Sequence, residues 1–367
     1  MSKTSKWIIA LIVIIIIVAG VWSYSSKPKV VPIGDKQTIT IGATLPLTGN
    51  LAFLGVPYKN AMMMALESLQ SDPNLKYNYK IVFEDDQFDP AQAVTTVNKL
   101  ISVDKVDAVA SFGSPTGSAI SPITEQNKIV HFNGIASDPS VAVGDYNFVH
   151  WTPPYKEVSL LLSELNKRNL KNVVLFEQNQ PGVLAVTNSL RSQVAGSGVN
   201  IISTQKFNGD EKDFRTLIQK AKSVTPKADI YLLEATSPQL EVLAKQISEA
   251  GIKAPLTSIE AFEFTDKPEL FKGDWFVAAA SQQQWFVDAY KAKYGSDPKL
   301  GSGNGYDVVN MLVSAFEGAG DAKTKPGEDN VRQALAGFSG LKGAMGDNLS
   351  IDKDGIVITQ PLVKTVQ

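Results

Sequence analysis

The sequence predicts an α/β protein made of two doubly wound parallel-sheet lobes, preceded by one N-terminal apolar helix. Three observations predict this architecture. Short apolar runs alternate with segments of helical period from residue 38 to residue 260. Pro153-Pro154 interrupts that alternation and divides it into two similar halves. Residues 7–26 form a long apolar stretch before the first of these halves.

The apolar stretch is long enough to reach across a membrane. Residues 7–26 contain no charged residue over 20 positions, and as a helix they would span about 30 Å. Lys3 and Lys6 precede the stretch, so the positive-inside tendency places residues 27–367 outside the cytoplasmic membrane.

Two interpretations of residues 1–26 remain open. Trp22 and Tyr24 are aromatic residues of the kind found at membrane interfaces, and they favour an uncleaved signal anchor that holds the protein on the outer face. The small residues at 18–20 would alternatively allow cleavage of a signal peptide, which would release a periplasmic or extracellular protein. Residues 27–36, with two prolines and four charges, read as a tether.

Composition limits the classes of function. The chain has 367 residues, of which 44% are apolar and 20% charged, and this suits about two globular domains. The first 34 residues carry four lysines and no acid, which leaves 31 basic and 37 acidic residues in the remainder, a net charge of −6. An acidic body argues against a nucleic-acid partner. The absence of cysteine excludes disulfides, thiol nucleophiles, thiolate metal ligands and a cysteine-linked lipid anchor.

The first half of the body alternates strands and helices. Strands are expected at 38–44, 80–85, 106–112 and 128–133, and helices at 56–70, 89–103 and from 119 onward. Asp89 followed by Pro90 is a good helix start, because the aspartate caps and the proline suits the first helical position. This order predicts a parallel sheet covered on both faces.

The second half repeats the alternation after Pro153-Pro154. Helices are expected at 156–169, 183–198, 213–224 and 237–251, and strands at 172–178, 200–207, 228–236 and 254–260. Beyond a strand at 275–281, three helical segments follow at 283–295, 306–320 and 329–338. Residues 349–366 are expected to form two strands around a Lys-Asp-Gly turn.

Two hydroxyl-rich turns lie where parallel strands end. SFGSPTGS, residues 111–118, contains neither the lysine of a phosphate-binding loop nor the G-x-S-x-G of a hydrolase elbow. NGIASDP, residues 133–139, follows the next strand. Because helix N-termini at such strand ends favour negative charge, the two turns could together hold one carboxylate. A polar turn without a ligand is the alternative for the first of them.

Three further segments complete a family resemblance. They read TLPLTGNLAFLGVPYKNAMMMA (44–65), FEDDQFDPAQAVTTVNKLI (83–101) and GLKGAMGDNLSIDKDG (340–355). With the two turns, these segments resemble the type I periplasmic solute-binding proteins, in particular the leucine/isoleucine/valine-binding branch that serves ABC importers of amino acids. The resemblance covers nearly all of residues 37–367.

The resemblance implies two lobes joined by three hinge crossings, with the ligand enclosed by closure of the lobes. The expected crossings lie at Thr152–Pro154, Ser281–Gln284 and Gly343–Asp347. The first lobe would then comprise residues 37–152 with 283–344, and the second lobe residues 153–282 with 345–367.

The resemblance also implies the ligand contacts. The ligand α-carboxylate would be held by Ser114, Thr116, the backbone of Ile135, Ala136 and Ser137. Its α-ammonium would meet Glu260, with Glu263 as the alternative acid. Neutral donors would then face the carboxylate and one acid would face the cation, so that both ligand charges are paired.

Apolar contacts and departures from the family complete the expected site. Phe53 and Leu54 would contact the ligand side chain, and Trp151 would be either a pocket wall or lobe packing. Residues 178–180 read Gln-Asn-Gln where the family usually offers a tyrosine nearby, and Thr236 stands near a second such position. These polar residues would either contact a polar ligand group or face solvent.

The sequence thus predicts a monomeric binding protein and no enzyme. It would capture an amino acid outside the membrane and deliver it to an ABC transporter permease, with no cofactor and no metal. A ligand-sensing module for a membrane signalling partner is the alternative. A serine hydrolase is a weaker one, because its base would have to be His131 or His150, which lie in strand-like segments. The acidic runs at 85–89 and 352–355 fall short of a calcium loop.

Overall fold

The computed structural model describes residues 36–367, of which Gln37–Gln367 form one compact unit. The predicted membrane or signal helix (1–26) and nearly all of the tether (27–36) lie outside the described residues. Among the residues that are described, no helix is both long and apolar enough to cross a bilayer.

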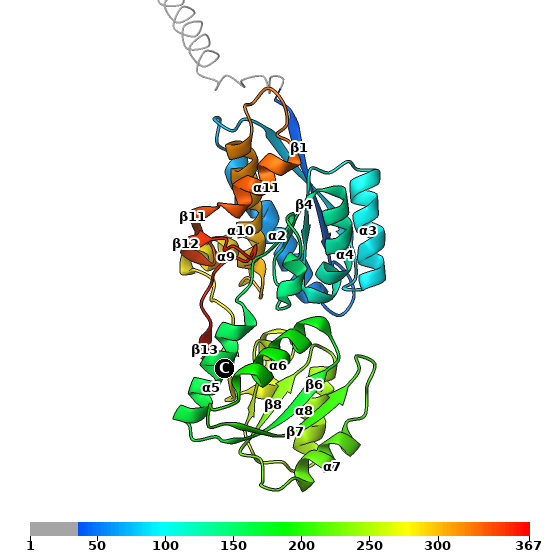
Figure 1. Cartoon of the computed structure of the whole chain (residues 1–367), viewed down its shortest axis with the longest axis vertical. Helices are drawn as coiled ribbons and strands as arrows, with labels where there is room; N and C mark the ends of the chain where they lie inside the picture. Colours follow the sequence, from blue (N-terminus) through cyan, green and yellow to red (C-terminus); the bar gives the residue numbers. More distant parts are fainter. Residues whose placement is uncertain (1–35) are drawn as a thin grey trace, which may run out of the picture. The chain divides into compact units, whose positions relative to one another are not determined.

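The first lobe is built on a five-stranded parallel sheet in the order β2-β1-β3-β4-β5 (Figure 1). Its strands are β1 (Thr38–Leu45), β2 (Asn78–Asp85), β3 (Ala108–Ser111), β4 (Val130–Asn133) and β5 (Asn147–Val149). Helices α3 (Pro90–Ser102) and α4 (Ser114–Asn127) cover one face, and α2 (Ala52–Gln70) and α10 (Ser302–Ala319) cover the other. The sheet is parallel and covered on both faces, as the alternation predicts.

Side-chain alternation along β1 produces the two cores of this lobe. Ile39 and Ile41 are buried against α2 and α10 in the larger core, while the other face of the sheet packs against Val97 and Leu100 of α3. The helix approaches closely, because a Cβ on Gly42 would lie 3.0 Å from Leu100. As expected, Asp89 caps α3 by accepting a hydrogen bond from the backbone N–H of Gln92 at 2.8 Å.

The second lobe repeats the design with a four-stranded parallel sheet in the order β7-β6-β8-β9. Its strands are β6 (Asn172–Gln178), β7 (Asn200–Phe207), β8 (Ile230–Glu234) and β9 (Leu256–Thr257). Its helices are α5 (Pro154–Lys167), α6 (Pro181–Gln193), α7 (Arg215–Ser223) and α8 (Gln239–Glu249). Residues of β8 alternate between a core with α7 and α8 and a core with α5 and α6.

The remaining elements divide between the lobes. Strand β10 (Trp275–Ala278) extends the second sheet through a parallel bridge from Ile259 to Val277, and it pairs antiparallel with β13 (Leu362–Thr365). Short 3₁₀ turns are η1 (Pro139–Ala142), η2 (Ala261–Glu263) and η3 (Pro268–Phe271). Helices α9 (Gln284–Tyr294) and α11 (Glu328–Ala336) and the hairpin of β11 (Ser339–Gly343) and β12 (Gly346–Ser350) pack on the first lobe.

The structure places the third crossing later than the expected Gly343–Asp347. Ile356 and Val357 belong to the first core. Gly355 accepts from, and Val357 donates to, the backbone of Val149 in β5, and only β13 pairs with a strand of the second lobe. The chain therefore passes between the lobes after Val357. The physical reason is Asp307 of α10, whose carboxylate accepts from the backbone N–H groups of Ala344 and Met345 at 2.5 and 2.9 Å. These bonds tie the turn between β11 and β12 to the first lobe.

The tail also differs from the predicted pair of strands around Lys-Asp-Gly. The main hairpin turns at residues 344–345, because residues 339–343, just beyond the helix predicted at 329–338, form β11 and pair with β12. The Lys-Asp-Gly turn itself is present, closed by a single antiparallel bridge between Ile351 and Val357.

Candidate functional site

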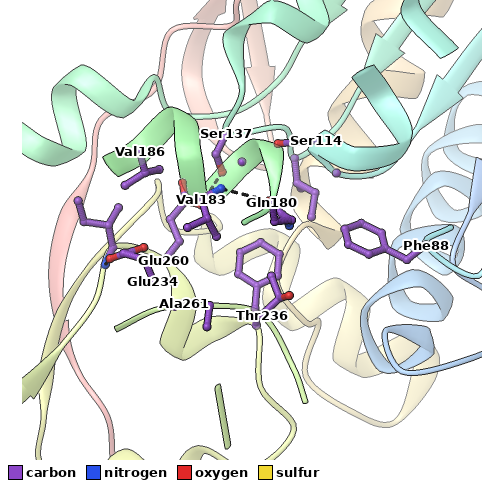
Figure 2. A pocket seen from close by; sticks show the side chains of 16 residues that line it. Phe88, Ser114, Ser137, Gln180, Val183, Val186, Glu234, Thr236, Glu260 and Ala261 are labelled. Carbon is purple, nitrogen blue, oxygen red and sulfur yellow. Dashed lines mark hydrogen bonds between the residues drawn. The ribbon is translucent and has the colours of Figure 1, made fainter. Parts of the chain in front are cut away.

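A small, partly open cavity of about 40 Å³ lies between the two lobes. From the first lobe it is lined by Ser114, Ile135 and Ser137, and from the second by residues that include Val183, Glu234 and Glu260 (Figure 2). A space of this size holds only a few water molecules, so the lobes are drawn together around it. The first sheet and the second sheet both present the carboxyl ends of their strands here, where α/β sheets bind ligands.

Glu260 joins the two lobes across this cavity. It follows β9 in the second lobe, yet its Oε2 accepts a hydrogen bond of 2.6 Å from Ser137 Oγ, and its Oε1 accepts from the indole Nε1 of Trp151. Both donors belong to the first lobe. The residue adopts a φ of 62°, in the left-handed region that non-glycine residues seldom occupy. The backbone is therefore held in an uncommon conformation that points this carboxylate at the opposite lobe.

Two further carboxyl groups are buried beside Glu260. Glu234 ends β8, and Glu157 lies in the first turn of α5. Burial raises the pKa of Glu260, although hydrogen bonds from Glu157, Ser137 and Trp151 lower it. Burial also raises the pKa values of Glu157 and Glu234 well above their usual range, and the charge of Glu260 adds to both shifts. Among the described residues no lysine, arginine or histidine forms an ion pair with any of the three. The second-lobe side of the site therefore gathers three carboxyl groups that no cation in the described part of the protein neutralises, and their raised pKa values favour the protonated form.

Of the three buried acids, Glu157 is the one whose carboxyl oxygens lack a hydrogen-bond donor. It is fully buried, and neither of its oxygens has a hydrogen-bond donor when the group is ionised. Its carboxyl group contacts that of Glu260. If Glu157 keeps its proton, it can donate a hydrogen bond to Glu260. The pair then carries one negative charge instead of two.

We expect Glu157→Gln to stabilise the protein at neutral pH. Because the pKa of Glu157 is raised on folding, the folded state holds a proton that the unfolded state releases above pH ~4.5, so stability falls as the pH rises through this window. Glutamine keeps the shape and a donor toward Glu260 without needing that proton. The free energy of unfolding at pH 7 should rise by about 1–2 kcal/mol, measured by urea denaturation between pH 4 and pH 8.

Glu164→Gln in the same helix is the matched control. Lys167 and Arg168 are ion-paired with Glu164 and lower its pKa, so this variant should gain nothing as the pH rises. A Glu157→Gln protein with the same pH profile as the parent chain would show that Glu157 is ionised in the folded state.

The opposite side of the cavity presents two helix N-termini. Ser114 begins α4 in the first lobe, and Pro181 begins α6 in the second. They meet closely, because a Cβ on Gly182 would lie 2.8 Å from Ser114 Oγ. The unpaired N–H groups and the dipole at each N-terminus favour a negative group between them. The cavity therefore offers an acidic side and an anion-favouring side, as a zwitterion requires.

The structure brings some of the sequence-predicted residues to this cavity. Ser114, Ile135, Ser137 and Glu260 line it, and Ala136 is buried beside them. Trp151 is buried and reaches the site through its bond to Glu260. Their role as ligand contacts remains a prediction.

Other predicted residues lie elsewhere. Thr116 is fully buried and donates its hydroxyl to the carbonyl of Phe112 at 2.6 Å, so it bonds to the turn that precedes α4. Phe53 and Leu54 border a separate cavity of about 460 Å³, because α2 directs them toward the hinge. Glu263, the alternative acid, lines that same second cavity and pairs with Lys364 at 2.6 Å.

The Gln-Asn-Gln segment has mixed roles. Gln180 lines the cavity and caps α6 by accepting from the backbone N–H of Val183 at 3.1 Å. Gln178 is buried, and its Oε1 accepts from the backbone N–H of Thr236 at 2.8 Å. It thereby fixes the neighbouring strand-end turn, and Thr236 also lines the cavity.

Several lining residues were not foreseen in the sequence. They include Phe88, Gly182, Val183, Val186, Glu234 and Phe264. Glu234 had a usable signal, because it directly follows the apolar run of β8 and so stands at a strand end that faces the cleft. The others reach the cavity through loops and helix starts whose approach depends on how the two lobes meet.

The two histidines are buried in the first lobe. His131 Nε2 lies 2.7 Å from Ser111 Oγ, and its Nδ1 lies 2.8 Å from Asn147 Oδ1. All three side chains are almost completely inaccessible, and burial lowers the pKa of His131 to about 4. His150 pairs with Asp307 at 3.2 Å, also fully buried. A substrate cannot reach either histidine, so these groups stabilise the core.

Comparisons with known proteins agree with this geometry. A family model described as periplasmic binding protein matches residues 38–365. A Leu/Ile/Val-binding protein homologue of Brucella abortus is 23% identical over 306 residues, which cover 75% of this chain and 74% of the relative.

Two solved structures share the fold. A leucine-binding protein of Thermotoga maritima superposes with a TM-score of 0.79 at 22% identity, covering 90% of this chain and 95% of that one. A branched-chain amino acid transporter substrate-binding protein of Streptococcus pneumoniae, in complex with isoleucine, gives a TM-score of 0.79 at 20% identity, with 90% and 96% covered. The family model covers nearly all of the described residues, so the chain belongs to the periplasmic binding protein family, whose members bind solutes and are not enzymes.

Proposed function

We propose that this protein captures an amino acid outside the cytoplasmic membrane by closing its two lobes around it, and presents the closed form to an ABC importer. The single observation that carries the proposal is a cavity lined both by Glu260 and by the first residues of two helices from opposite lobes, Ser114 of α4 and Gly182 of α6. An α-ammonium and an α-carboxylate are complementary to these two sides. The relatives named for leucine, isoleucine and valine support the same class of ligand.

Closure is a shift of population toward the closed state, so the ligand must contact both lobes to favour it. Ser114, Ile135 and Ser137 would contact the ligand from the first lobe, and Glu260 from the second. In the structure Glu260 already accepts bonds from Ser137 and Trp151. A ligand ammonium at Glu260 would add to these bonds, since each carboxylate oxygen accepts more than one donor.

We further propose that residues 7–26 deliver the protein to the outer side of the membrane, as an anchor or as a cleaved signal. An ABC transporter permease is the partner expected for this family. Mass spectrometry of the protein from membrane and soluble fractions would show whether residues 1–26 remain. An intact N-terminus in the membrane fraction would support the anchor, and a chain that starts near residue 21 would support cleavage.

A thermal-shift screen of the purified protein tests the function. The twenty amino acids, short amides and simple sugars are added separately, and the unfolding midpoint is measured for each. A ligand at 1,000 times its dissociation constant adds about 4 kcal/mol to stability, which corresponds to a rise of several degrees. A rise confined to amino acids supports the proposal. A rise with sugars or amides alone, or with none of these solutes on folded protein freed of copurified ligand, contradicts it.

A further inference from the structure

The charges lining the cavity do not balance for a simple zwitterion. Glu234 and Glu260 are both among the lining residues, whereas no lysine, arginine or histidine is among them. The other polar groups, such as Ser114, Ser137 and Thr236, are neutral. One α-ammonium would pair with one carboxylate. The other would then have to keep a proton, as its raised pKa indicates, or meet a second cation, because an unpaired charge is costly in a buried site.

The Glu234 carboxyl group is buried and only partly hydrogen-bonded. It is 2% exposed, and its Oε1 accepts from the backbone N–H of Ile259 at 2.7 Å. Its Oε2 has no hydrogen-bond partner within residues 36–367, although the side chain borders the cavity. The bond to Ile259, the residue before Glu260, also keeps the two carboxylates close to each other.

The neighbouring strand shows how the protein treats an acid that it neutralises itself. Glu177 of β6 is the register partner of Glu234 in β8, and it is equally buried. It is nevertheless ion-paired with Arg191 of α6 and with Lys206 of β7. The two acids thus lie at equivalent strand ends and are equally buried. Glu177 is paired with cations of the protein, whereas Glu234 has none in the described part of the chain and lines the cavity.

We propose that Glu234 binds a second cationic nitrogen of the ligand, so that the solute is a diamino acid or a similar small molecule with two positive nitrogens. The inference rests on the proposed function, in which Glu260 binds the α-ammonium. The side-chain nitrogen then meets Glu234, and the α-carboxylate remains at the helix N-termini. Because the two carboxylates are close, a short side chain of three or four bonds is sufficient to place the second nitrogen.

Two isosteric ligand pairs test the second nitrogen. Ornithine differs from norleucine, and 2,4-diaminobutyrate from norvaline, by an ammonium in place of the terminal methyl group. Isothermal titration calorimetry on the purified protein should give an affinity at least tenfold higher for one of the diamino acids than for its apolar counterpart, as a hydrogen-bonded ion pair provides. Glu234→Gln should remove this preference, and it should fold normally because glutamine still accepts from Ile259.

Glu263→Gln is the matched control, since Glu263 lies at the other cavity and pairs with Lys364. It should leave the preference unchanged. Apolar amino acids that bind as tightly as the diamino acids, or a preference that survives Glu234→Gln, would overturn the inference while the proposed function stands. If neither kind of amino acid binds, the proposed function fails as well.

Discussion

Glu260→Gln is expected to weaken ligand binding by about 2–5 kcal/mol, which is roughly 30-fold or more in the dissociation constant. The ligand ammonium would be enclosed in a cavity that has lost the carboxylate nearest to it. Glutamine keeps the shape of the side chain, and one of its termini can still accept a bond from Trp151 or Ser137. The loss should therefore appear in affinity and much less in the thermal midpoint of the ligand-free protein. Calorimetric titration with the best ligand of the thermal-shift screen measures it.

Glu263→Gln again provides the comparison, because it makes the same chemical change three residues away. Its carboxylate is paired with Lys364 and borders the cavity near the hinge. If the Glu263 variant loses more affinity than the Glu260 variant, the ammonium partner has been assigned to the wrong acid. Unchanged affinity in the Glu260 variant would remove that residue from the site.

Gly182→Leu is expected to obstruct closure and to reduce affinity by about 1–3 kcal/mol, or roughly 5- to 150-fold. Gly182 lies in the first turn of α6, where a Cβ would approach Ser114 Oγ of the other lobe to 2.8 Å. A leucine side chain has no room there unless the lobes separate. Since its contact is made across the cleft, the stability of each lobe should be nearly unaffected. Titration calorimetry gives the affinity, and small-angle scattering with and without ligand reports the closure.

Gly318→Leu serves as the control for this variant. Gly318 is also helical, in α10, and a Cβ there would meet nothing within 4 Å. Its affinity and its ligand-induced compaction should match those of the parent chain. Normal closure in the Gly182 variant would mean that the closed form used by the ligand is more open at this point than the one described here.

The repeated sheet architecture could be predicted from local sequence because it depends on short-range patterns. The apolar run 38–44 and the Asp89-Pro90 start of α3 each specify their element through periodicity or capping. The third crossing could not be found in this way. It depends on a bond between Asp307 and the backbone at 344–345, which are 37 and 38 positions away in the chain.

The candidate site also contains residues that local sequence could predict and residues that it could not. Strand ends of a parallel sheet meet at one edge, and this predicted the two turns that hold Ser114 and Ser137. The family resemblance then implied Glu260 at the end of a later strand. Phe53 and Leu54 also follow the first strand, but α2 carries them toward the hinge. A position after a strand therefore predicts the edge of the sheet and does not predict the direction of the side chain.

The sequence by itself determined two α/β lobes in succession, the polar turns at their strand ends and the absence of thiol chemistry, because these follow from periodicity, capping and composition. Only the tertiary structure decided which groups meet across the cleft. It placed Ser137 and Trp151 of one lobe on Glu260 of the other, and it left Glu234 facing the cavity without a cation while Glu177 was paired. These contacts join segments that are far apart in the chain. A local sequence pattern contains no information about the distance between two lobes.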